Sequence, residues 1–148
     1  MKLSVGRLVS ILYRKNQVYL NVVLKPLQLT AAEVPVLIHL FKRDGISQEE
    51  LSSFLVIDKA ATARVVQSLL DKGFLRKEKD PDDRRANQVF LTGHAIAQRA
   101  TIFSHLQQWT DFLTDGLDET AVQTMFTVLE AMAEKVEGTD FREWGQQG

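Results

Sequence analysis

The order of hydrophobic periodicities between residues 30 and 92 constrains the fold more than any other feature. Apolar residues recur with helical spacing in three successive segments, and the pattern then changes to an alternation of period two. The alternating segments 74–78 and 88–91 flank a turn-forming run at 80–83, which predicts a short β-hairpin with a charged tip. Three helices followed by a hairpin predict a mainly α fold with a small β wing.

Capping residues mark where these helices begin and end. The segments 30–33 and 47–50 both have the pattern of a capping box, in which a hydroxyl and a glutamate satisfy the first free N–H groups of a helix. Asp58 is the predicted N-cap of the third helix, and Gly73 is its predicted C′ residue. Pro35 lies just after the first turn of the helix that starts at residue 30, so we expect a local irregularity there.

Helical patterns also flank this middle region. One helix is predicted over 3–24 and another over 93–116, and a last helix with a heptad-like apolar stripe starts at Asp118. These stripes are too large for the winged core to cover, which predicts self-association; a three-helix bundle within one chain is the alternative. The predicted parts are an N-terminal dimerisation helix (1–28), a winged helix-turn-helix core (29–92), C-terminal dimerisation helices (93–137) and a tail (138–148).

Composition and charge exclude several classes of protein. The 148 residues include no cysteine, which rules out disulfides, thiolate metal sites and cysteine nucleophiles. We find no apolar run long enough for a membrane span and no pattern of a signal peptide, so we expect a cytoplasmic protein. The net charge of −1 hides an asymmetry, because residues 1–25 carry five basic and no acidic residues whereas residues 93–148 carry three basic and nine acidic ones. A face that meets a polyanion therefore belongs to the first 92 residues.

The helix that follows Asp58 has the composition of a helix that enters a DNA major groove. Its first turns contain the small residues Ala60, Ala61, Thr62 and Ala63. Small side chains allow the backbone to approach base edges and thymine methyl groups, and Lys59, Arg64 and Gln67 can reach phosphates or bases from the same region. The alternative is that the alanines are simply good helix formers.

The predicted hairpin tip combines acidic and basic residues. Arg84 and Arg85 follow Asp82 and Asp83, and an arginine held by a neighbouring carboxylate is suited to a narrow minor groove. The alternative is an ordinary solvated turn.

Several motifs in this order resemble the MarR family of bacterial regulators. Asp83-Arg84-Arg85, followed after five residues by Leu91-Thr92, is similar to the family's wing signature D-x-R-x5-L-T. Leu29-Thr30 resembles the entry to its second helix, and residues 44–51, 57–64 and 70–75 resemble its third helix, its recognition helix and the exit from that helix. The likeness covers residues 29–92 closely and the flanking helices only in pattern and length.

The resemblance implies a winged helix-turn-helix homodimer that binds palindromic double-stranded DNA, as a repressor relieved by a small molecule. The implied contacts on the helices are Ser47, Gln48, Lys59, Ala60, Ala61, Thr62, Ala63, Arg64 and Gln67, of which Lys59, Thr62, Arg64 and Gln67 face the major groove. On the wing, Arg85 matches the family's arginine, Asp83 the acid that orients it, and Arg84 a variable position. The family's usual glycine three residues after the Leu-Thr pair is replaced by Ala95, which leaves the start of the fifth helix open.

Regulators of this family often bind small aromatic or phenolic effectors between the dimer helices and the DNA-binding part. Side chains that can line such a pocket are Tyr13, Tyr19, His39 and Trp109, although ordinary packing explains each of them as well. We predict no cofactor and no metal site, because the three histidines are far apart in sequence and no thiol accompanies them.

Two other classes of function compete with a DNA-binding regulator. One is a winged-helix module that binds proteins and has lost specific DNA binding, which the weak net charge allows and the basic residues near 59–64 and 84–85 oppose. The other is an enzyme, but the chain contains no phosphate-binding loop, nucleophile elbow or metalloprotease motif.

Overall fold

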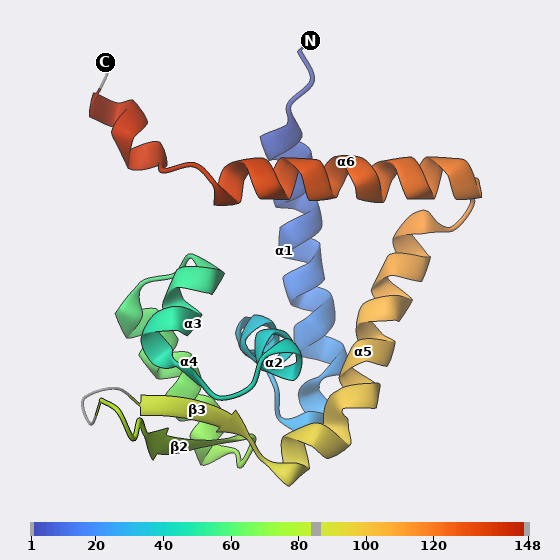
Figure 1. Cartoon of the computed structure of the whole chain (residues 1–148). Helices are drawn as coiled ribbons and strands as arrows, with labels where there is room; N and C mark the ends of the chain where they lie inside the picture. Colours follow the sequence, from blue (N-terminus) through green and yellow to red (C-terminus); the bar gives the residue numbers. More distant parts are fainter. Residues whose placement is uncertain (1, 84–86, 147–148) are drawn as a thin grey trace. The chain divides into compact units, whose positions relative to one another are not determined.

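The computed structural model describes residues 2–83 and 87–146, and its α-helices and the two strands of the hairpin appear in the predicted order (Figure 1). The helices are α1 (Val5–Val23), α2 (Val34–Lys42), α3 (Gln48–Leu55), α4 (Lys59–Asp71), α5 (Gly93–Thr114) and α6 (Glu119–Glu137). The strands are β1 (Ile46–Ser47), β2 (Leu75–Lys79) and β3 (Asn87–Leu91). Short 3-10 segments are η1 (Lys25–Leu27), η2 (Ala31–Glu33) and η3 (Phe141–Gln146). The mainly α fold with a small β wing is therefore confirmed.

The chain divides into two compact units, Met1–Trp109 and Thr110–Gly148, and the boundary falls inside α5. The first unit contains α1, the three following helices, the sheet and most of α5. The second contains the end of α5, α6 and η3. The four-part division predicted from the sequence stays a prediction, but α1 shares the core of the first unit because Leu20 and Leu24 are buried in it.

The predicted helix caps are present. The Asp58 carboxylate accepts a hydrogen bond from the Ala61 N–H at 2.6 Å, which starts α4 as expected. Gly73 follows the end of α4 with φ of +79°, a left-handed conformation that favours glycine. The irregularity expected at Pro35 is the 3-10 turn η2, after which α2 begins at Val34. Pro35 thus lies in the first turn of α2, where its missing N–H costs no hydrogen bond.

The wing is a three-stranded antiparallel sheet in the order β1-β3-β2. Ile46 pairs with Val89, so the segment before α3 is joined to the hairpin. Only β2 and β3 were predicted, because a strand of two residues has no detectable alternation. The turn before β1 needs Gly45, since its φ is +74° and an added Cβ would lie 2.7 Å from a ring carbon of Phe90.

One hydrophobic core holds the first unit together. Its fully buried side chains come from α1, α2, α3, α4, the sheet and α5, and include Leu24, Leu37, Leu51, Val66, Phe74, Val89 and Ile102. In Figure 1, α3 and α4 lie on one side of α2 and the wing lies below them. Because helices distant in sequence share this core, the orientation of α4 depends on the whole unit.

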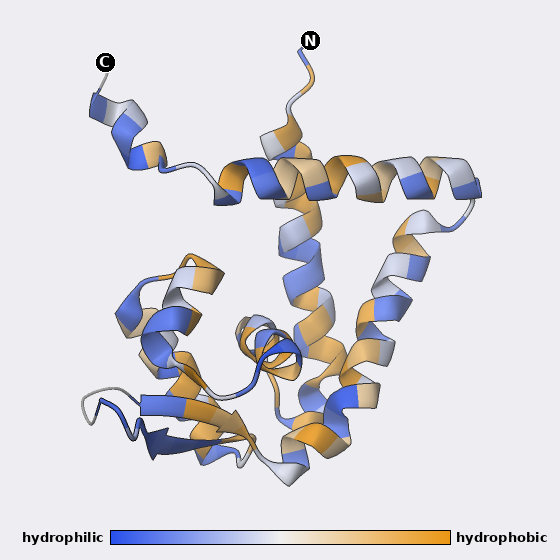
Figure 2. Ribbon diagram, in the orientation of Figure 1, coloured by the Kyte–Doolittle hydropathy of each residue, from blue (hydrophilic) through white to orange (hydrophobic). Residues whose placement is uncertain are grey.

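Many apolar side chains outside this core are exposed. In α1 the apolar residues Val5, Leu8 and Leu12 are exposed. In α6 every residue is at least partly exposed, including the apolar residues Phe126 and Leu129. Figure 2 shows hydrophobic colouring along both helices. None of the helices in the described part of the chain is long and apolar enough to span a membrane.

Candidate nucleic-acid interface

Helices α3 and α4 form a helix-turn-helix. Val56 ends α3 in a left-handed conformation (φ +54°, ψ +40°), which turns the chain sharply into α4. Inside the corner, the Ser52 hydroxyl donates to the Thr62 hydroxyl oxygen at 2.8 Å, and both side chains are buried. This buried hydrogen bond joins the first turns of α4 to α3 and helps to fix the angle between the two helices.

Packing divides α4 into a buried and an exposed face. Thr62, Val66 and Leu69 are fully buried, at the spacing of one helical stripe. The side chains that this packing leaves exposed are Lys59, Ala60, Ala63, Arg64 and Gln67. Ala61 is half-buried between the two faces. The exposed set is basic and amide-bearing around small residues, which suits a helix that lies in a major groove.

The prediction that Thr62 faces the groove is wrong. The residue has no exposed surface, and its hydroxyl donates to the Asp58 carbonyl at 3.0 Å while accepting from Ser52. Its position in the motif predicted that Thr62 contacts DNA, but the residue lies on the buried face of α4 with Val66 and Leu69. Its role in this structure is to satisfy polar groups inside the helix-turn-helix.

Two exposed side chains on α4 have partners within the chain. The Lys59 ammonium lies 3.4 Å from a carboxylate oxygen of Glu49, and the Gln67 amide donates to Asp71 at 2.8 Å. Both pairs are at the surface, so each is weak and exchangeable for a contact with DNA. Ser47 and Gln48 at the start of α3 are half-buried, and the Ser47 hydroxyl accepts from the Glu50 N–H at 3.1 Å as the N-cap.

The predicted wing contacts fall at the tip of the hairpin. Arg84 and Arg85 lie outside the described residues, which end before them at Asp83 and resume at Asn87. Asp83 is exposed. The turn before it contains a hydrogen bond from the Asp82 N–H to the Asp80 carboxylate at 2.8 Å, in agreement with the predicted turn.

Thr92 joins the wing to α4 and α5. Its hydroxyl donates to the Gly73 carbonyl at 2.6 Å, and the Ala95 N–H donates to the same hydroxyl oxygen at 3.2 Å. Thr92 therefore caps α5 at Gly93 and also ties this helix to the end of α4. This answers the question left open by Ala95, since α5 begins directly after the Leu-Thr pair.

The four predicted effector-binding residues do not form one group. Tyr19 stacks on Trp109 with ring centroids 5.1 Å apart, and its hydroxyl donates to the His105 carbonyl at 2.8 Å. Burial raises the pKa of the Tyr19 phenol. His39 instead packs against Phe54 of α3 at 4.2 Å, and Tyr13 is exposed and accepts a hydrogen bond from Gln17.

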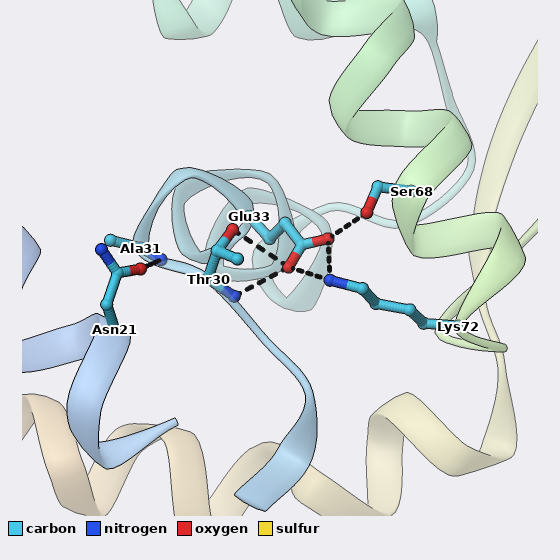
Figure 3. Close-up of polar contacts among 6 residues, drawn as sticks. All are labelled: Asn21, Thr30, Ala31, Glu33, Ser68 and Lys72. Carbon is cyan, nitrogen blue, oxygen red and sulfur yellow. Dashed lines mark hydrogen bonds and ion pairs between the residues drawn. The ribbon is translucent and has the colours of Figure 1, made fainter. Parts of the chain in front are cut away.

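Sequence reasoning missed a buried polar cluster behind α4, drawn in Figure 3. The Glu33 carboxylate is 2% exposed and accepts hydrogen bonds from the Ser68 hydroxyl and the Lys72 ammonium at 2.7–2.9 Å. Burial by itself raises the pKa of Glu33, but hydrogen bonds from Lys72, Ser68 and the Thr30 N–H outweigh it and leave that pKa below its usual range. The capping-box pattern identified Glu33, whereas nothing in the sequence pairs it with a lysine 39 positions later.

Comparison with known proteins identifies relatives that share the helix-turn-helix and wing of this chain. A family model described as the MarR family matches residues 29–86. The Multiple antibiotic resistance protein MarR of Escherichia coli (strain K12) is 33% identical over 99 residues, which cover 66% of this chain and 69% of that protein. The chain belongs to the MarR family. A MarR transcriptional regulator from Methanosarcina mazei Go1 has a similar structure, with a TM-score of 0.87, 34% identity, and coverage of 88% of this chain and 94% of that one.

Membership of the MarR family sets the broad function. The HTH-type transcriptional regulator BilQ of Clostridium symbiosum (strain WAL-14163) is a further relative, 29% identical over 102 residues that cover 68% of this chain and 69% of that protein. MarR-family proteins are transcriptional regulators, not enzymes. The chain is therefore a DNA-binding transcription regulator, and the helix-turn-helix described above is its candidate DNA-binding surface.

Proposed function

We propose that this MarR-family protein is a homodimeric repressor that reads a palindromic operator with α4 and the wing and is released by a small molecule. The exposed face of α4 carries the proposal, because it presents Lys59, Arg64 and Gln67 around Ala60 and Ala63 while Val66 and Leu69 anchor its other face. Arg85 and Asp83 would act from the wing, as the resemblance to the family's motif implies. A cytoplasmic location is part of the proposal, because a regulator must share a compartment with its DNA.

The exposed apolar faces of α1 and α6 support a dimer. Val5, Leu8 and Leu12 in the first unit and Phe126 and Leu129 in the second remain accessible to a partner. Exposed apolar helix faces of this kind on a chain of 148 residues are typical of an interface between subunits. A twofold dimer would place its two recognition helices about 34 Å apart, one turn of DNA.

Selection of bound sequences from a randomised duplex pool at near-physiological salt tests the proposal. We expect enrichment of a palindrome with half-sites about 10 base pairs apart. Binding without enrichment, which weakens steeply as salt rises, would mean phosphate contacts alone and would favour the protein-interaction module instead.

The wing assignment has its own test on the selected operator. Arg85→Ala is expected to weaken operator binding by about 1–3 kcal/mol, as for the loss of one specific contact. Arg142→Ala, which removes the same charge in the second unit, is the matched control and should bind like wild type. Equal operator affinity of Arg85→Ala and wild type would remove the wing from the proposal.

Relief by an effector needs a separate measurement. We expect an aromatic or phenolic ligand to lower operator affinity while the dimer stays intact, because the ligand would favour a dimer whose recognition helices no longer match the half-sites. Tyr19 and Trp109 stack on each other, and their aromatic rings suit contact with an aromatic or phenolic ligand. A ligand that dissociates the dimer would contradict this mechanism.

A further inference from the structure

We propose that the η2 turn (Ala31–Glu33) is a rigid connector between α1 and α4, and that Glu33 is a positioning residue that sets the separation of the two recognition helices. The inference rests on the proposed function, in which α4 reads DNA and α1 belongs to the dimer interface. It assigns a role in operator recognition to residues that do not belong to the exposed face of α4, with the buried Glu33 at their centre.

The first end of the connector is tied to α1. The Asn21 side-chain oxygen accepts a hydrogen bond from the Ala31 N–H at 2.8 Å (Figure 3). Ala31 is 2% exposed, and Leu20 and Leu24 on either side of Asn21 are buried in the core. The start of η2 therefore follows the position of the last turn of α1.

The second end is tied to the last turns of α4. One oxygen of the Glu33 carboxylate accepts from the Thr30 N–H at 2.8 Å, from the Thr30 hydroxyl at 3.1 Å and from the Lys72 ammonium at 2.8 Å. The other oxygen accepts from the Ser68 hydroxyl at 2.7 Å and from Lys72 at 2.9 Å. Both oxygens are thus fully used, and two of their partners belong to the C-terminal end of α4.

This connector resists gradual distortion. Its hydrogen bonds to a buried carboxylate are charge-assisted and therefore strong, and moving α4 away would leave that charge with its Thr30 contacts alone. The two ties lie two positions apart, at Ala31 and Glu33, so η2 has little length in which to absorb movement. We therefore treat α1, η2 and the end of α4 as one rigid body.

Small changes at the tied end have large effects at the reading end. Helix α4 has 13 residues and so is about 20 Å long. A tilt of about 10° at Lys72 would move its first residue by about 3.5 Å, close to the spacing of about 3.4 Å between adjacent base pairs. In a twofold dimer, this displacement changes the distance between the recognition helices and hence the half-site spacing that fits.

The test measures tolerance to half-site spacing. The selected operator is compared with duplexes that have one base pair more or fewer between the half-sites. Each duplex is titrated with wild type and with the variants Glu33→Gln, Ser68→Ala and Asn21→Ala. We expect wild type to prefer its own spacing about tenfold or more. Each variant should lower the ratio of the affinity for the operator to the affinity for the altered duplexes at least about threefold, while it remains folded and dimeric. Removing the Glu33 charge would by itself strengthen the attraction of the protein to phosphate. A simple charge effect would therefore make Glu33→Gln bind the operator more tightly, whereas loss of positioning would make it bind more weakly.

Controls separate positioning from general damage. Ser104→Ala makes the same change as Ser68→Ala on an exposed part of α5 and should keep the wild-type ratio. Lys72→Arg keeps the cation and should retain most of the wild-type spacing preference, whereas Lys72→Met should lose it. If Glu33→Gln does not fold, Ser68→Ala still tests the connector, because it leaves the carboxylate its Lys72 and Thr30 contacts.

The outcomes that overturn the inference are distinct. Folded, dimeric variants that keep the wild-type spacing ratio would show that η2 does not position α4. If wild type itself fails to prefer the operator over a scrambled duplex, the proposed function fails, and the inference fails with it; the wild-type titration alone reveals that case.

Discussion

A single buried carboxylate shows how strongly one residue depends on its surroundings. Glu33 stays charged at 2% exposure because five hydrogen-bonding contacts replace the water it lost. Its pKa lies below the usual range, so the folded state favours the ionised form. The stability that this provides is present above the pKa of the unfolded chain, about 4.3, and disappears as the pH falls through the folded pKa.

A pH series on Glu33→Gln tests this sign. Wild type should be more stable than the variant at pH 7, and the difference in free energy of unfolding should shrink below about pH 4 as Glu33 becomes protonated. Urea denaturation between pH 3 and 7 measures both proteins. Glu130→Gln, an exposed change of the same kind in α6, is the control. A wild-type advantage that stayed constant down to pH 3 would contradict the assignment.

Val56 carries backbone strain in the helix-turn-helix. A β-branched residue at φ of +54° is rare, and such a conformation costs on the order of 1–3 kcal/mol. Because the side chain is 81% exposed, Val56→Gly loses little packing. It should stabilise the protein by about 1 kcal/mol after the greater chain entropy of glycine is subtracted.

Val56→Ala is the matched control for this strain, because alanine keeps the Cβ. It should recover much less stability than Val56→Gly in the same thermal or urea denaturation. Equal stabilisation by both substitutions would mean that the side chain beyond Cβ, and not the left-handed backbone, is unfavourable.

At the scale of elements, the buried hydroxyl pair joins α3 to α4. Thr62→Val keeps the shape of the side chain but removes the acceptor of the Ser52 hydroxyl, which is 7% exposed. We expect a loss of about 1–3 kcal/mol in the free energy of unfolding. The double variant Ser52→Ala/Thr62→Val should lose less than the sum of the two single changes, since no polar group is then left unpaired.

The same variants test the corrected role of Thr62. A buried structural residue should leave the base preference of the selected operator unchanged, as measured by competition with single-base substitutions. A change in base preference without a change in stability would indicate that Thr62 contacts the DNA after all.

At the scale of the whole molecule, we expect the exposed stripe of α6 to decide the oligomeric state. We expect wild type to be a dimer in sedimentation equilibrium and Leu129→Asp to be largely monomeric, because a charge would be buried in the apolar interface. Thr127→Asp places the same charge on the other side of this helix and should leave the dimer intact. A monomeric wild type would favour the three-helix bundle within one chain.

Local signals in the sequence determined the elements of this protein. Thr30, Ser47, Asp58 and Thr92 mark helix starts, and Gly73 and Gly116 mark helix ends, because capping chemistry acts within a few residues. The alternation on either side of the turn near Asp80 predicted the hairpin for the same reason. Several motifs in order, among them the one around Leu91-Thr92, indicated the family.

Tertiary structure decided what each side chain does. Strand β1 exists only because β3 pairs with it, since a two-residue strand has no stability of its own. Thr62 is buried and Arg64 is exposed because α3 covers one face of α4, a contact between separate elements. The Glu33–Lys72 pair joins residues 39 positions apart. Hydrogen bonds and burial at such separations depend on how the elements pack, and a local sequence pattern carries no record of that packing.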